Sequence, residues 1–199
     1  MKIITNRFES AQKNMDFDAH LINERNTNSW LRIYLWEKPG ITQAFNKNIP
    51  DHLKKFDHAK RCSGGGIVFH HPNDLLLTWI SPIEREKNII TSKLNRFKKF
   101  IMPFISPYLK KYSRPIKKQD INYCQHYHSH FELFSNQDKV YAVAARKKKQ
   151  HLLIQAIIHR GVVLPEFLSL NEYQLKKSHI PTKKIYKQLL KVPNLIALT

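Results

Sequence analysis

A cysteine followed by alternating histidines is the part of this sequence where residue types and spacing first suggest chemistry. After Cys124, a histidine stands at every second position: His126, His128 and His130. A thiol among imidazoles can be a low-pKa nucleophile, and on a strand the four side chains would share one face, as metal ligands can. One strand seldom completes a tetrahedral site, however, and no second Cys/His cluster has zinc-like spacing. We therefore predict no metal, and keep a nucleophile and an unreactive buried cysteine as alternatives for Cys124.

A lysine at the start of an apolar strand is the second candidate for catalysis. Lys139 follows a turn at residues 135–138 and precedes the apolar run 140–145. This position makes Lys139 the other candidate beside Cys124. The alternative is an ordinary surface lysine at a hairpin.

Three of the five glycines of the chain lie in a row in Arg61-Cys62-Ser63-Gly64-Gly65-Gly66-Ile67-Val68-Phe69-His70. Glycine is costly in ordered structure unless the backbone needs a positive φ or a ligand must come close. An arginine precedes the glycines and an apolar strand follows them, so the stretch predicts a site where a ligand lies on bare backbone. A flexible turn between two strands is the alternative.

Composition and charge limit the classes of protein that fit. The 199 residues are 42% hydrophobic and carry a formal net charge of +19, which predicts one globular domain over residues 1–199 with an affinity for acidic partners. No apolar run reaches membrane-spanning length and no secretory signal is visible, so we expect a cytoplasmic location without a membrane partner. Nucleic acid is a possible partner, but no nucleic-acid-binding motif accompanies the lysines. A solvated basic surface is the alternative.

The elements that would position these residues form an α+β pattern. We expect a first helix capped by Asn14, a strand from Trp30 to Trp36, and an antiparallel hairpin of residues 67–70 with 74–80. A helix should start at Ser81-Pro82 and end at Pro103 or Pro107, with apolar residues on one face. Strands are predicted over 139–145 and 152–158, and a last helix around Ile185 and Leu189.

Several of these segments together resemble the family of lipoate–protein ligases and octanoyltransferases. The glycine stretch is similar to the family signature Arg-x-Ser/Thr-Gly-Gly-x-Ala-Val-x-His. Further similarities, in the family's order, are Asn14-Met15-Asp16-Phe17-Asp18, Tyr34-Leu35-Trp36-Glu37-Lys38-Pro39, Phe131-Glu132-Leu133 and Lys139-Val140. Several motifs in order are more specific than any one of them.

The resemblance implies a fold, a site and partners. The fold would be the catalytic domain shared with biotin ligases, a curved and mostly antiparallel sheet with flanking helices. Cys124 and Lys139 would be catalytic, at the spacing of the cysteine-type octanoyltransferases (139 − 124 = 15). The substrate would contact Arg61, Ser63, Gly64, Gly65, Gly66 and His70. Both partners, an acyl carrier protein and a lipoyl-type acceptor domain, would be acidic.

The resemblance also leaves two activities open. A cysteine-type transferase would move an octanoyl or lipoyl group through a Cys124 thioester and need no cofactor. An ATP-dependent ligase would need ATP and Mg²⁺. One departure from the family bears on both, because Ala142 stands where a glycine is expected and should narrow the acyl tunnel or bar a positive φ. A non-catalytic member that only binds acyl-proteins or nucleic acid is a third alternative.

Overall fold

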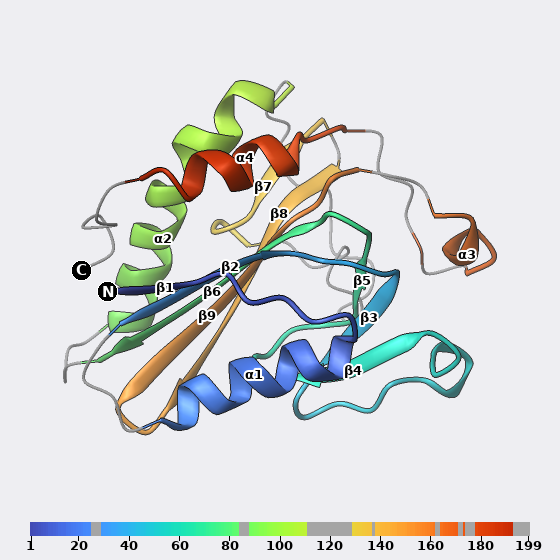
Figure 1. Cartoon of the computed structure of the whole chain (residues 1–199), viewed down its shortest axis with the longest axis horizontal. Helices are drawn as coiled ribbons and strands as arrows, with labels where there is room; N and C mark the ends of the chain where they lie inside the picture. Colours follow the sequence, from blue (N-terminus) through green and yellow to red (C-terminus); the bar gives the residue numbers. More distant parts are fainter. Residues whose placement is uncertain are drawn as a thin grey trace.

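Two sheets and their flanking helices build the protein in the computed structural model (Figure 1). The structure describes residues 1–24, 29–83, 88–110, 129–136, 138–161, 164–170, 173 and 178–192. The larger sheet has the strand order β1-β2-β6-β9-β8-β7. Its strands are β1 (Lys2–Ile4), β2 (Trp30–Leu35), β6 (Leu75–Pro82), β7 (Leu133–Ser135), β8 (Asp138–Lys148) and β9 (His151–Ile158). All its pairs are antiparallel except β1 with β2.

The smaller sheet has the order β4-β3-β5, in which β3 pairs parallel with β4 and antiparallel with β5. It contains β3 (Gly40–Ala44), β4 (Asp57–Arg61) and β5 (Val68–His70), and a short 3₁₀ helix, η1 (Asp51–Leu53), precedes β4. The helices are α1 (Ala11–Asn23), α2 (Ile89–Ile105), α3 (Pro165–Leu168) and α4 (Thr182–Leu189), with a second 3₁₀ helix, η2 (Ser106–Tyr108), after α2. This arrangement confirms the predicted α+β class and the mostly antiparallel sheet.

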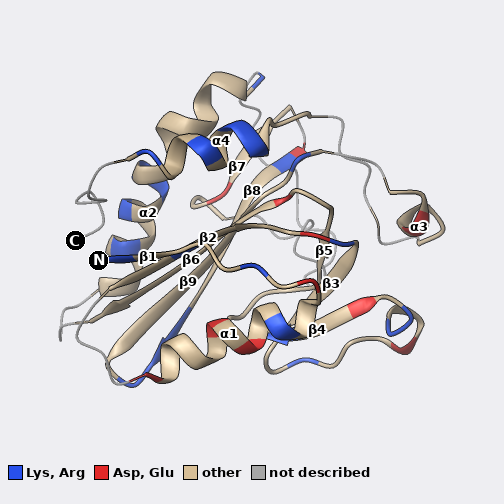
Figure 2. Cartoon of the chain, viewed as in Figure 1, with Lys and Arg blue, Asp and Glu red and all other residues tan. Residues whose placement is uncertain are grey.

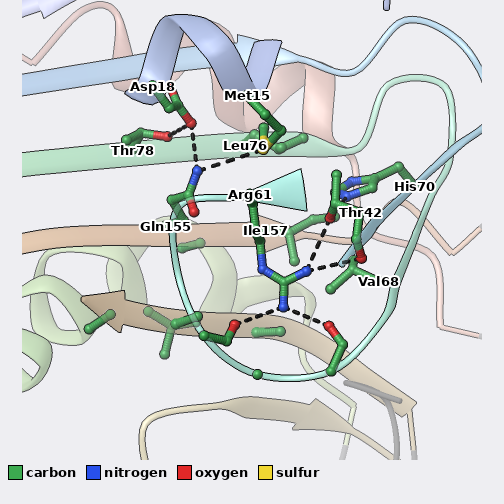
Figure 3. A pocket seen from close by; sticks show the side chains of 18 of the residues that line it. Met15, Asp18, Thr42, Arg61, Val68, His70, Leu76, Thr78, Gln155 and Ile157 are labelled. Atoms are coloured by element: carbon green, nitrogen blue, oxygen red, sulfur yellow. Dashed lines mark hydrogen bonds between the residues drawn. The ribbon is translucent and has the colours of Figure 1, made fainter. Parts of the chain in front are cut away.

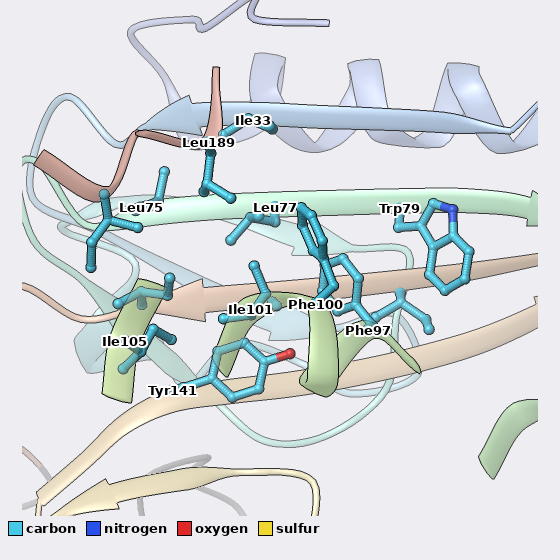
Figure 4. Close-up of a cluster of buried hydrophobic side chains, with 14 of the residues drawn as sticks. Ile33, Leu75, Leu77, Trp79, Phe97, Phe100, Ile101, Ile105, Tyr141 and Leu189 are labelled. Carbon is cyan, nitrogen blue, oxygen red and sulfur yellow. The ribbon is translucent and has the colours of Figure 1, made fainter. Parts of the chain in front are cut away.

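Different elements pack on the two faces of the larger sheet. Helices α2 and α4 pack on one face, where Trp79, Phe97, Ile101 and Tyr141 lie in one apolar cluster with Leu189 of α4 (Figure 4). Helix α1 lies on the opposite face, together with the smaller sheet (Figure 1). Because core side chains fill the α2 face, the α1 face is the one left for a binding pocket. No helix in the described part of the chain is long and apolar enough to span a bilayer.

The first helix begins one turn earlier than expected. Its N-cap is Ser10, whose Oγ accepts a hydrogen bond from the Lys13 N–H. Asn14, the predicted cap, lies inside the helix and is buried. Its side chain instead accepts a hydrogen bond from Arg32 Nη2 at 2.6 Å. The prediction was wrong because asparagine favours caps locally, while the partner Arg32 is supplied by a distant strand.

The predicted hairpin of residues 67–70 with 74–80 does not form. β5 pairs with β3 in the smaller sheet, and β6 lies between β2 and β9 in the larger one. The connection between them is bound to the end of β2, because Asn73 N donates to Trp36 O and Trp36 N donates to Asp74 O. Asn73 takes a left-handed conformation with φ 67°. These bonds turn the chain from one sheet into the other instead of folding it back on itself.

The helix expected from Ser81-Pro82 starts later. Both residues belong to β6, where they pair with Leu152 and His151, and α2 begins at Ile89. The helix also runs through Pro103 and ends at Ile105. Proline is tolerated there because Pro103 lies in the last turn of the helix. Its missing N–H therefore removes a backbone hydrogen bond only near the helix end. The strands predicted over 139–145 and 152–158 and the helix containing Ile185 and Leu189 are confirmed.

Candidate active site

A pocket of about 270 Å³ opens between the α1 face of the larger sheet, helix α1 and the smaller sheet (Figure 3). Its lining combines two residues of α1, the glycine stretch, residues of β3, β5, β6, β8 and β9, and Glu132. These are Met15, Asp18, Thr42, Arg61, Gly64, Gly65, Gly66, Val68, His70, Leu76, Thr78, Glu132, Ala142, Val143, Ala144, Ala145, Gln155, Ala156 and Ile157. Most of these side chains are apolar or small, so the pocket suits an alkyl chain better than a charged ligand.

The floor of the pocket follows the register of three strands. One row across the sheet consists of Leu76, Ile157 and Ala142, and it is apolar. The next row on the same face consists of Thr78, Gln155 and Ala144, and it contains the polar groups. Alternation along each strand places both rows on the α1 face, since residues two apart point the same way.

Arg61 holds the glycine stretch in shape. Its Nη2 donates to the carbonyls of Gly64 at 2.8 Å and Gly66 at 2.6 Å, and its Nη1 donates to Thr42 O at 3.0 Å. Gly65 has φ +98°, and a Cβ there would lie 3.1 Å from the guanidinium. The glycines are therefore needed for the fold of this loop as well as for access to its backbone.

His70 forms the wall next to the glycine stretch. Its Nε2 lies 2.7 Å from Thr42 Oγ1 and its ring stacks on Trp36 at 4.1 Å. Burial lowers the pKa of His70 well below its usual range, with the cation Arg61 adding to the effect. The ring is therefore neutral at pH 7 and contributes a flat, largely apolar surface to the pocket.

A buried ion pair lies at the edge of the pocket. Lys139 Nζ donates to Glu132 Oε1 at 2.9 Å, and both side chains are 2% exposed. The Ser129 N–H donates to the other carboxylate oxygen of Glu132 at 2.9 Å. Burial raises the pKa of Glu132, while the Lys139 charge opposes that shift. Glu132 lines the pocket, and Lys139, which is not a lining residue, is joined to the pocket through its ion pair with Glu132.

The described cysteine is not suited to nucleophilic catalysis. Cys62 is half-buried, with Asp18 nearby, and burial raises the pKa of its thiol to about 11. It therefore stays protonated at neutral pH. A thiol nucleophile for this pocket would have to be the other cysteine of the chain, Cys124.

The family whose description is the lipoyl protein ligase A/B catalytic domain matches residues 10–195. The chain belongs to this family. A Thermoplasma acidophilum protein solved with bound lipoic acid has the same fold, with a TM-score of 0.71, 14% identity, and coverage of 95% of this chain and 82% of that chain. A lipoate-protein ligase A bound with ATP gives a TM-score of 0.64, 15% identity, and coverage of 99% and 81%. No curated protein matches this sequence directly.

An archaeal lipoate protein ligase from the same organism, solved as part of a bi-partite system with its E2 lipoyl domain, also shares the fold. Its TM-score is 0.64 at 15% identity, and the match covers 95% of this chain and 80% of that chain. At these identities the likeness shows the fold alone. The family match and the fold together identify this chain as a lipoate-protein-ligase-like catalytic domain.

The structure brings most of the predicted substrate-binding residues to one pocket. Arg61, the three glycines and His70 line it. Ser63 does not, because it is fully buried beside the loop, and its Oγ has no hydrogen-bond partner among the described residues. That any of these predicted residues contacts a substrate stays a prediction.

Of the two predicted catalytic residues, the structure describes Lys139 and not Cys124. Lys139 is buried beside the pocket, so its alternative reading as a surface lysine was wrong. Cys124 falls in residues 111–128, outside the described residues, and the same holds for His126 and His128. The pairing of Cys124 with Lys139 therefore stays a prediction.

Sequence reasoning missed several polar residues of the pocket as site residues, among them Asp18, Thr78 and Gln155. A signal for the last two was present, because each interrupts an apolar run of a buried strand, residues 75–80 in β6 or residues 152–158 in β9. A buried polar side chain needs a partner, and the shared partner is Asp18. Its carboxylate accepts from Thr78 Oγ1 at 2.8 Å and from Gln155 Nε2 at 2.7 Å (Figure 3).

A second buried cluster, outside the pocket, consists of His71, Asp74 and His159. Asp74 Oδ2 lies 3.2 Å from His71 Nδ1 and 3.1 Å from His159 Nδ1, and Asp74 Oδ1 accepts from the Arg160 N–H. The neighbouring histidines hold the pKa of Asp74 well below its usual range, although burial opposes them. His71 Nε2 lies 2.6 Å from the Tyr173 hydroxyl. These contacts join the β5–β6 connection to the end of β9.

Proposed function

We propose that this protein transfers an octanoyl or lipoyl group from acyl carrier protein, through a thioester on Cys124, to a lysine of a lipoyl-type acceptor domain. The observation that supports it most is the apolar pocket, with Arg61 and the glycine stretch on one side and the Lys139–Glu132 pair at its edge. An alkyl chain gains about 0.8 kcal/mol for each CH₂ it buries, so a pocket of this lining can hold the acyl chain while its carbonyl stays near Lys139.

The transfer proceeds in two displacements. The Cys124 thiolate attacks the carbonyl carbon of the donor thioester, the carrier's C–S bond breaks, and the carrier thiolate takes the proton that Cys124 lost. The neutral amine of the acceptor lysine then attacks the Cys124 thioester, a C–N bond forms, the C–S bond to Cys124 breaks, and the amine proton goes to the released cysteine sulfur. Lys139 and backbone N–H groups of the glycine stretch stabilise the oxyanion that develops in each step.

An ATP-dependent ligase would instead need a place for Mg²⁺, which prefers carboxylate oxygens and water. The two carboxylates that line the described pocket are already committed. Asp18 accepts from Arg32, Thr78 and Gln155, and Glu132 accepts from Lys139 and Ser129. A ligase would therefore have to hold Mg²⁺ chiefly through the substrate phosphates and water, with a carboxylate that also keeps these hydrogen bonds.

Intact-mass spectrometry after incubation with octanoyl–acyl carrier protein tests the proposal. We expect the wild-type chain and the matched variant Cys62→Ala to gain the mass of one octanoyl group, and Cys124→Ala to gain none. Modification of an acceptor domain that requires ATP and lipoate and survives Cys124→Ala would establish the ligase instead. If neither reaction occurs, the proposed transfer is wrong.

The basic surface offers a test of the acidic partners. Arg146 and Lys148 lie just after pocket residue Ala145, at the end of β8, on the face that strand alternation gives to Ala144, and Arg146 donates to the Cys62 carbonyl beside the glycine stretch. A second basic group, on α4, lies over the opposite face of the sheet (Figure 2). An acidic domain that delivers or receives the acyl group should contact the first group.

We therefore expect Lys148→Glu to lower kcat/KM for the protein substrates several-fold at low salt, and progressively less as salt is added. The control is Lys187→Glu on α4, which changes the net charge equally and should have little effect. Equal losses in the two variants would mean that overall charge, and not a docking site at the pocket, attracts the partner.

A further inference from the structure

The end of the pocket that lies away from Lys139 is polar. β8 leaves Lys139 and reaches Ala144 five residues later, where Ala144 is in register with Gln155 of β9. Gln155 is in register with Thr78 of β6, and Asp18 of α1 closes this end (Figure 3). A saturated acyl chain that reached this end would meet these polar groups with its methyl terminus.

The amide of Gln155 can have only one orientation. Asp18 Oδ1 accepts from Arg32 Nη1 at 2.8 Å, and Asp18 Oδ2 lies 2.7 Å from one terminal atom of the Gln155 amide. An ionised carboxylate only accepts hydrogen bonds, so the atom facing it must be the NH₂ group. The amide oxygen, Gln155 Oε1, then points away from Asp18.

That oxygen is a buried acceptor that lacks a donor. Gln155 Oε1 is shielded from solvent and has no hydrogen-bond partner among the described residues, although its residue lines the pocket. Buried carbonyl oxygens nearly always accept a hydrogen bond. A ligand that supplies an O–H or N–H to this oxygen therefore gains a hydrogen bond that an alkyl terminus cannot make.

We propose that Gln155 makes this pocket selective for acyl chains that carry a hydrogen-bond donor near the distal end. This inference rests on the proposed function, in which the pocket holds an acyl chain. Hydroxyl and amide N–H groups are strong donors and thiols weak ones. The selected class therefore includes hydroxyacyl chains and the dithiol form of a lipoyl group, in preference to octanoyl.

Equilibrium binding of two eight-carbon acids to the whole chain tests the inference. We expect 8-hydroxyoctanoic acid to bind the wild-type protein about tenfold more tightly than octanoic acid, the worth of one hydrogen bond to a buried unpaired acceptor. Equal affinities, or tighter binding of octanoic acid, would overturn the selectivity while leaving the proposed acyl pocket intact. If neither acid binds the wild-type protein, the acyl pocket and the proposed function fail together.

Two variants identify the atom responsible. Gln155→Leu removes the acceptor and should abolish or reverse the preference between the two acids. Thr78→Val is the matched control, because it also removes one donor to Asp18 but leaves Gln155 Oε1 in place, and it should retain the preference. Both acids are measured on each variant, so a general loss of affinity cancels in the ratio. A preference that persists in Gln155→Leu would assign the donor contact to another group and overturn the proposal.

Discussion

Lys139→Met is expected to lower the free energy of unfolding by about 3–5 kcal/mol, because it leaves the Glu132 carboxylate buried without its counter-charge. Glu132 is 2% exposed and its closest cation is the Lys139 ammonium at 2.9 Å. Urea unfolding of the purified variants measures the change. Lys147→Met, on the exposed end of the same strand, is the control and should change stability by less than about 0.5 kcal/mol.

A double variant separates stability from chemistry. Lys139→Met/Glu132→Leu removes both charges, so most of the lost stability should return, since an apolar pair of similar size often replaces a buried ion pair without loss. Acyl transfer should stay absent in both variants if Lys139 acts on the carbonyl. A double variant that regains activity together with stability would show that Lys139 is only structural.

The loss of stability in Lys139→Met should depend on pH, and the direction follows from the pKa of Glu132. Burial raises the pKa of Glu132, and Lys139 opposes that shift more than the Ser129 N–H or Lys98 does, so its loss raises the pKa further. A carboxyl whose folded pKa lies above its unfolded value contributes stability below the unfolded pKa and loses it as the pH rises. The stability gap between Lys139→Met and wild type should therefore narrow as the pH is lowered toward the ordinary carboxyl range.

Asp18→Ala is expected to have a similarly large effect, about 3–5 kcal/mol, because it leaves the Arg32 guanidinium buried without an anion. Both side chains of this pair are fully buried, with 2.8 Å between Arg32 Nη1 and Asp18 Oδ1. The same change removes the acceptor that orients Thr78 and Gln155. Binding of acyl acids should therefore weaken along with stability.

The control for Asp18 lies two residues away on the same helix. Asp16 is exposed, and its carboxylate accepts a hydrogen bond from Gln12 Nε2 at 2.7 Å. Asp16→Ala changes the net charge equally and should alter the free energy of unfolding by less than about 0.5 kcal/mol. Thermal unfolding of the two variants compares them directly, and equal losses would contradict the assigned role of Asp18.

Local sequence patterns correctly predicted the strands, the helix and the loop whose conformation depends mainly on their own residues. The apolar runs of β8 and β9, the amphipathic end helix and the glycine stretch with Arg61 lie where they were expected. The reason is that alternation and glycine content report directly on backbone conformation and on which face is buried.

The partners of those elements were not readable from the sequence. β5 and β6 look like a hairpin because they are adjacent and apolar, yet each pairs with a strand from another part of the chain. Hydrogen-bond pairing between strands depends on contacts far apart in sequence, and a local pattern carries no information about them.

The residues alone were enough to predict the α+β class, the site at the glycine stretch, and the resemblance to the lipoyl ligase family. Packing between distant elements buries Lys139 against Glu132, makes Arg61 shape the glycine loop, and brings Asp18, Thr78 and Gln155 together at one end of the pocket. One cause accounts for all three. A residue type states which hydrogen bonds a side chain can make, but the packing of distant elements decides which of them it makes and which atom is left to bind a ligand.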